Sequence, residues 1–290
     1  MSQSKENQED AELPESRVRE LGLTETEQKD IKELGRAKAV VIHEVIRLEG
    51  EHELQRSVSA LAWSGLAAGL SMGFSLVGEG LIHANLPDKP WRPLVSSLGY
   101  TVGFLIVVLG SQQLFTETTV TAILPLLQRR NSDTLIRVLR LWAIVLVTNL
   151  IGALIFAWVV GHTEVFTPEV RQVFTELGLK EMDGGFWTIF WRGIFAGWLI
   201  ALMVWLLPGA EPSQIVIIII ITYLVGLADL AHIIAGSVEV LYTVTTKVAS
   251  WEKYFGGFMI PTLLGNIVGG VSLVAALNYA QVAPVAKQNR

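Results

Sequence analysis

Long apolar stretches dominate this sequence and limit what it can fold into. Short charged turns separate six of them, and each is about as long as the roughly 20 residues that a helix needs to cross a bilayer. The mean hydropathy of the whole chain, +0.47, agrees with this pattern. The sequence therefore predicts an all-α membrane protein with one six-span domain over residues 57–282. The stretches cover about 57–83, 94–128, 134–160, 186–207, 214–248 and 256–282, with breaks near 110–117 in the second and 228–237 in the fifth.

Positive charge is sorted between the turns. The turn after the second stretch holds Arg129, Arg130, Arg137 and Arg140, whereas the loop over 161–185 is mainly acidic. Loops rich in arginine and lysine stay in the cytoplasm, so this turn is predicted to be cytoplasmic. With six spans, both termini then lie on the cytoplasmic side.

The ends of the chain are polar. Residues 1–56 lack the apolar core and cleavage site of a signal peptide. From about Glu15 onward their apolar residues recur at helical spacing, which favours a partly helical cytoplasmic arm lying against the membrane domain. Residues 283–290 are predicted to be a short cytoplasmic tail. The net charge of −5, without a basic stripe, argues against a nucleic-acid partner.

The two halves of the membrane domain, about 57–160 and 186–282, resemble each other. Two short motifs recur in the same order, and Leu114 and His232 occupy matching places in the two breaks, 118 residues apart. Each half has three spans, an odd number, so the second half must run in the opposite direction, as in many transporters. The matched motifs are 65–69 with 193–197, and 149–153 with 266–270.

His232 is the most informative single residue. It follows a run of isoleucines near the middle of the fifth stretch, where an ionisable group usually faces a cavity or pathway. Non-helical backbone at membrane depth must be buried in protein or line a cavity. The polar string 111–113 is therefore predicted to face His232 across a pathway. Asp229 could stabilise a protonated His232 or cap the following half-helix through its amides, and we favour the cap.

Four motifs resemble the formate/nitrite transporter family in order and spacing. They are Leu114-Phe115-Thr116, Asn149-Leu150-Ile151-Gly152-Ala153-Leu154, Ala231-His232-Ile233-Ile234-Ala235 and Gly265-Asn266-Ile267-Val268-Gly269-Gly270. Gln113 stands where the family usually has an acidic residue, and Ala231 where it often has Glu.

This resemblance implies an aquaporin-like protomer with interrupted helices two and five. It also implies a homopentamer in the bacterial inner membrane that passes small monovalent anions such as formate or nitrite, with or without protons. Thr116 and His232 would form the polar centre, with Asn266 near them. Tyr100, Phe104, Leu114 and Val225 would form the apolar constrictions, and Gln113, Asn149 and Asp229 would support the centre.

A central histidine has two ways to help an anion cross. Protonated, it supplies positive charge; neutral, it donates a hydrogen bond together with the Thr116 hydroxyl. We therefore predict an anion channel or transporter that pH modulates through His232, with no cofactor, no metal and no enzymatic activity. Two alternatives stay open: a non-conducting membrane scaffold or sensor that acts through the arm, and a channel for neutral solutes.

Overall fold

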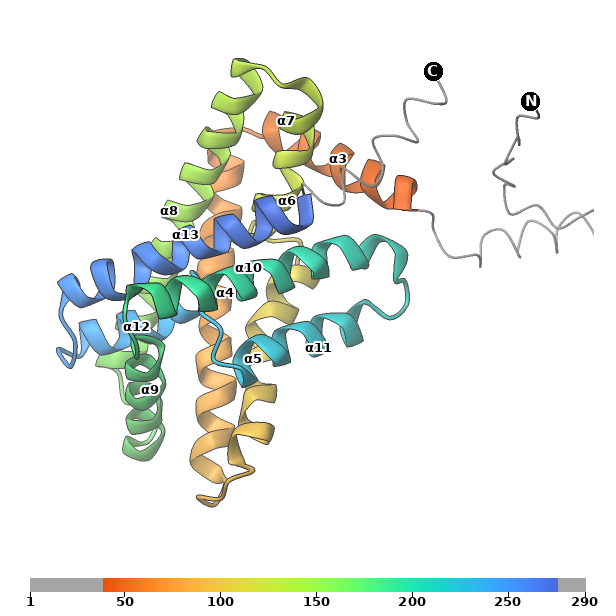
Figure 1. Cartoon of the computed structure of the whole chain (residues 1–290). Helices are drawn as coiled ribbons and strands as arrows, with labels where there is room; N and C mark the ends of the chain where they lie inside the picture. The colour runs from red at the N-terminus through yellow and green to blue at the C-terminus, as the bar shows by residue number, and fades with distance from the viewer. Residues whose placement is uncertain (1–38, 276–290) are drawn as a thin grey trace, which may run out of the picture.

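The structure is a computed structural model that describes residues 39–275, and these residues form helices without any strand. The predicted all-α class is confirmed (Figure 1). Residues 1–38 of the predicted arm, the end of the last stretch and the predicted tail lie outside the described residues. The helices are α3 (Ala39–Gln55), α4 (Val58–Asn85), α5 (Arg92–Leu109), α6 (Phe115–Thr121), α7 (Ile123–Arg129), α8 (Ser132–His162), α9 (Pro168–Glu181), α10 (Phe186–Leu206), α11 (Gln214–Leu227), α12 (Ala235–Thr245) and α13 (Ile260–Val268). The short helices η1 (Leu207–Gly209), η2 (Lys253–Met259) and η3 (Gly269–Ala275) complete them.

Five of the described helical segments are long and apolar enough to cross a membrane. Helix α11 is apolar but shorter, and it ends where the fifth stretch was predicted to break. The candidate spans are Val58–Asn85, Arg92–Leu109, Ser132–His162, Phe186–Gly209 and Lys253–Ser272.

Helices α5 and α11 end in the same way. A residue with a left-handed backbone follows each helix, Ser111 at φ 49° and Asp229 at φ 50°. The next amide then turns back to a carbonyl inside the helix, from Leu230 to Val225 at 3.0 Å and likewise after α5. This arrangement satisfies carbonyl groups that would otherwise be orphaned at a helix end. The chain can therefore leave each helix while its backbone amide and carbonyl groups stay hydrogen-bonded.

Two glycines allow the long helices to cross closely. A Cβ atom on Gly69 of α4 would lie 2.1 Å from the Asn149 carbonyl oxygen on α8. A Cβ atom on Gly197 of α10 would lie 2.4 Å from the Asn266 carbonyl oxygen on α13. Small residues give close contact between membrane helices in this way. These contacts bring each asparagine within reach of a helix break.

Helix α9 was not predicted. The acidic segment 161–185 was interpreted as a loop, but it contains a helix with proline at its first position, which favours helix initiation. Its buried residues Val170, Val173 and Phe174 recur at helical spacing, and the helix packs against α12 and α4. The many charged residues of this segment made its amphipathic pattern difficult to recognise in the sequence.

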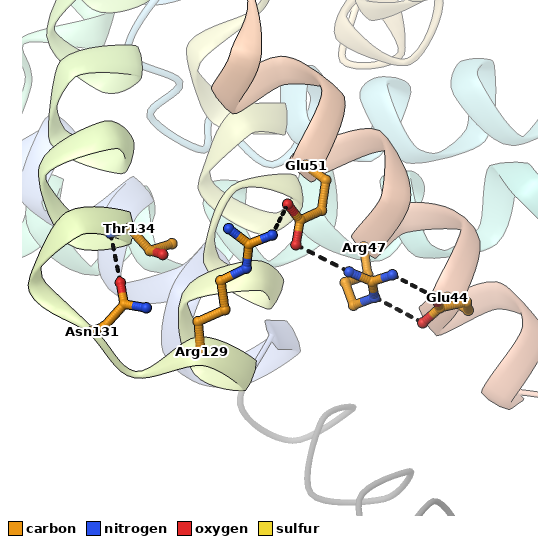
Figure 2. A network of polar contacts seen from close by, with 6 residues as sticks. All are labelled: Glu44, Arg47, Glu51, Arg129, Asn131 and Thr134. Atoms are coloured by element: carbon orange, nitrogen blue, oxygen red, sulfur yellow. Dashed lines mark hydrogen bonds and ion pairs between the residues drawn. The ribbon is translucent and has the colours of Figure 1, made fainter.

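Helix α3 lies beside α7 at one end of the molecule (Figure 1). Figure 2 shows the ion pair that joins the two helices: Glu51 of α3 contacts Arg129 of α7 at 2.5 Å, and Arg47 of α3 contacts the same carboxylate at 3.1 Å. Arg140 of α8 also donates to the carbonyl oxygens of Leu54 and Arg56. The described part of the arm is therefore attached to the bundle by several polar contacts.

Candidate functional site

Thr116 and His232 meet in the centre of the protein. The Thr116 hydroxyl oxygen lies 2.9 Å from Nε2 of His232. Both side chains are almost fully buried, with exposed fractions of 1% and 0%. Thr116 lies in the first turn of α6, after the first break, and His232 precedes α12, after the second. The structure thus brings together the two residues that were predicted to form the polar centre.

The surroundings of His232 define its tautomer. Nδ1 of the ring lies 3.3 Å from the amide nitrogen of Ile234 and 3.2 Å from that of Ala235. Amides only donate, so Nδ1 accepts and carries no proton, and the proton of the neutral ring sits on Nε2. Nε2 then donates to the Thr116 oxygen. The hydrogen of the Thr116 hydroxyl is left to donate elsewhere.

Buried aromatic side chains lie beside this pair. The ring of Phe104 lies 5.0 Å from the imidazole, edge-on, and the ring of Tyr100 lies 5.4 Å from that of Phe104. Leu114 and Val225 are fully buried as well. The polar pair therefore lies in an apolar environment, where a hydrogen bond is electrostatically stronger than in water.

Two asparagines hold the breaks through equivalent contacts. Asn149 accepts from the Phe115 amide at 2.9 Å and donates to the carbonyl oxygens of Gly65 and Gln113. In the other half, Asn266 accepts from the Ile233 amide at 2.9 Å and donates to the carbonyl oxygens of Gly193 and Ala231. Each side-chain amide is saturated. Asn266 therefore lies near His232, as predicted, but has no free donor for a solute.

Two cavities lie at opposite ends of α5 and α11. The first, the α3 cavity, is about 340 Å³ and contacts Leu109 at the end of α5 and Gln214 at the start of α11. The second, the α9 cavity, is about 180 Å³ and contacts Arg92 at the start of α5 and Leu227 at the end of α11. Phe104 lies between these ends on α5, so its neighbour His232 lies between the two cavities.

Gln113 does not face His232. Its side-chain amide donates to Glu53 of α3 at 2.9 Å, and the Thr121 hydroxyl donates to the other oxygen of Glu53 at 2.5 Å. Ser111, Gln112 and Gln113 line the α3 cavity instead. The prediction that this string faces His232 was wrong, because the carboxylate of α3 draws the glutamine side chain away. The two contacts join residues that are separated by 60 and 68 positions in the sequence, so no local sequence pattern predicts them.

Asp229 has neither of its two predicted roles. Helix α12 has Ile234 at its N-cap, whose side chain makes no capping bond, and the amides of Ile234 and Ala235 donate to His232 rather than to Asp229. The carboxylate of Asp229 pairs with Lys180 of α9, with the nitrogen and oxygen atoms 2.7 Å apart. The left-handed backbone at Asp229 follows α11, and the side chain extends to the α9 cavity, which both residues line.

Glu53 makes the attachment of α3 sensitive to pH. Burial raises the pKa of its carboxyl group to about 7, well above its ordinary value of 4.5. Between pH 4.5 and about 7, the protein therefore binds more protons when α3 is docked than when α3 is released. Docking of α3 weakens as the pH rises through this window. At about 1.4 kcal/mol per pKa unit, the change reaches about 3 kcal/mol.

Hydrogen exchange of the α3 amides, corrected for intrinsic rates, tests this expectation. We expect the wild type to exchange faster at pH 8 than at pH 5.5, whereas Glu53→Gln keeps α3 protected at both values. Glu44→Gln, which removes a carboxylate exposed at the surface of the same helix, serves as the control. An equal pH response in the wild type and Glu53→Gln would contradict the assignment.

Comparisons with known proteins agree with the sequence motifs. A family model described as formate/nitrite transporter matches residues 40–280. Inner membrane protein YfdC of Escherichia coli K12 is 44% identical over 246 residues, which cover 85% of this chain and 79% of that protein. Formate channel BtFdhC of Bacillus thuringiensis is 24% identical and covers 82% of this chain and 93% of that protein.

Solved structures show the same fold. A pentameric formate channel with formate bound superposes with a TM-score of 0.65 at 18% identity and covers 78% of this chain and 98% of its own. An FNT family ion channel superposes with a TM-score of 0.69 at 17% identity and covers 83% of this chain and 98% of its own.

Proposed function

The chain belongs to the formate/nitrite transporter family, and we propose that it is a membrane channel for small monovalent anions such as formate or nitrite. The family resemblance seen in the sequence motifs is confirmed, and it is a family of transporters rather than enzymes. The observation that carries the proposal is the buried pair of Thr116 and His232 between two cavities.

The pair offers a hydrogen bond to an anion in an apolar, buried environment. Leaving an anion without partners in an apolar medium costs several kcal/mol or more. The His232 ring donates to the Thr116 oxygen, and the Thr116 hydroxyl donates to the anion as it passes Phe104. The amides of Ile234 and Ala235 support this direction, because they donate to Nδ1 of His232 and leave the proton of the ring on Nε2. No protonated histidine is needed for this step.

We further propose that pH modulates passage through His232. Protonation at Nδ1 would make this nitrogen a hydrogen-bond donor facing two other donors, the amides of Ile234 and Ala235. The two hydrogen bonds to Nδ1 must therefore break before the ring is protonated. Protonation of the ring is therefore coupled to movement of the first turn of α12. A pH profile of flux that is steeper in the wild type than in His232 variants supports this part of the proposal.

The architecture proposed for the membrane is an inverted repeat of three spans per half. Helix α5 with α6 and α7 would form span two, and α11 with α12 would form span five. The equivalent contacts of Asn149 and Asn266 support this pairing of the halves. The positive-inside rule places α3, the arginine-rich turn and both termini in the cytoplasm. The E. coli relative is named an inner membrane protein, which supports a bacterial inner membrane location.

The same reasoning supports a homopentamer, because a similar solved channel is described as pentameric. Mass measurement of the full chain in mild detergent tests this: we expect five copies, and a monomer or dimer contradicts it.

Flux measurements in proteoliposomes separate the proposed function from its alternatives. Formate, nitrite, acetate and chloride are each tested from pH 5 to 8 against protein-free vesicles. We expect formate or nitrite to pass. Glycerol or water alone would indicate a neutral-solute channel, and no flux of any solute would favour a scaffold or sensor.

A further inference from the structure

The α9 cavity has an unusual charge balance for the entrance of an anion pathway. Three of its lining side chains are carboxylic acids, Glu79, Glu176 and Asp229, and three are basic, His83, Arg92 and Lys180. Arg92 is also paired with the exposed Asp88, at 3.2 Å. Lys180 is the other cationic side chain of this lining, and it lies on α9.

The ammonium group of Lys180 is occupied. Its nitrogen lies 2.7 Å from a carboxylate oxygen of Asp229, and the two side chains are 54% and 40% exposed. Such exposed ion pairs contribute little to stability. The pair instead changes what a solute meets, because a lysine charge beside a carboxylate attracts an approaching anion only weakly.

The backbone does not require aspartate at this position. Asp229 lies in the left-handed region, where asparagine and glycine are tolerated best. Ser111, which has the equivalent place after α5, has the same backbone with an uncharged side chain. An asparagine at 229 is therefore expected to keep the helix end and remove only the charge.

We propose that Asp229 determines the electrostatic selectivity of the α9 mouth by withholding Lys180 from incoming anions. This inference rests on the proposed function of the central pair. With its ammonium group paired to Asp229, Lys180 gives the mouth little attraction for an anion, and small weak acids are then expected to enter in their neutral, protonated form as well. Release of Lys180 would convert the mouth into one that attracts the anion itself.

Formate uptake by proteoliposomes at pH 7 and low salt, over a range of formate concentrations, tests the proposal. Asp229→Asn is expected to raise uptake at low formate by roughly two- to tenfold, as expected for one unit charge at a wet protein surface. Glu176→Gln removes the same charge from the same cavity without freeing Lys180, so a smaller gain is expected. Most of the Asp229→Asn gain should vanish when Lys180→Met is added, and it should shrink at high salt because charges are screened.

Three outcomes contradict the inference alone: no gain with Asp229→Asn in a wild type that conducts, an equal gain with Glu176→Gln, or a gain that survives Lys180→Met in full. Absence of formate uptake in the wild type and Asp229→Asn alike contradicts the proposed function, and the inference with it.

Discussion

Replacement of His232 by Asn is expected to lower formate flux by roughly 10- to 100-fold. The imidazole links the amides of Ile234 and Ala235 to the Thr116 hydroxyl, and a shorter side chain cannot make both contacts. Without the imidazole, the Thr116 hydroxyl is no longer directed toward the anion, and a lost hydrogen bond to a charged group costs about 1.5–3 kcal/mol, which corresponds to the expected factor. The same variant is expected to flatten the pH profile of flux between pH 5 and 8.

His162→Asn is a matched control, because that histidine is exposed at the end of α8. It should leave formate flux and its pH profile unchanged. If His232→Asn conducts at the wild-type rate with the wild-type pH profile, the imidazole has no part in passage.

Leucine in place of either Asn149 or Asn266 is expected to destabilise the protein by similar amounts. Each variant loses three hydrogen bonds and leaves one amide and one carbonyl group unpaired at a buried helix break, because the third partner is the carbonyl of a glycine inside a continuous helix. Unpaired buried groups cost about 1–3 kcal/mol each, so we expect a loss of roughly 2–5 kcal/mol after partial relaxation. Thermal unfolding in detergent, followed by helix content, measures the effect.

Asn85→Leu is the control, because Asn85 makes a single exposed contact with the Leu81 carbonyl at the end of α4. It should change stability little. A large effect at Asn149 together with none at Asn266 would contradict the proposal that the two halves are equivalent.

Sequence reasoning was most successful where a feature repeats. The apolar stretches, the matched glycine motifs and the two breaks follow from local pattern compared between the two halves. The pairing of Thr116 with His232 was implied by the family resemblance, and the structure places the two side chains together. Asn149 and Asn266 were found in the same way, although only the structure shows that their amides are saturated.

Features that depend on one distant partner were not predicted. Glu53, on α3 of the arm, accepts a hydrogen bond from Gln113, and Asp229, which follows α11, forms an ion pair with Lys180 of α9. The hydrophobic periodicity of the sequence does not predict such pairs, because a carboxylate at either position could equally well be exposed to solvent. Helix α9 was missed for another reason, since its acidic surface outweighed a short apolar face.

The most direct test of anion passage at the centre compares Thr116→Val with Thr116→Ser. Valine matches threonine in size but lacks the hydroxyl, whereas serine loses only a methyl group and keeps the hydroxyl that donates to the anion. In formate flux from proteoliposomes, Thr116→Ser is predicted to stay close to the wild type, and Thr116→Val to fall at least about tenfold. If Thr116→Val conducts as fast as Thr116→Ser and the wild type, anions do not depend on this hydroxyl and the central claim is contradicted.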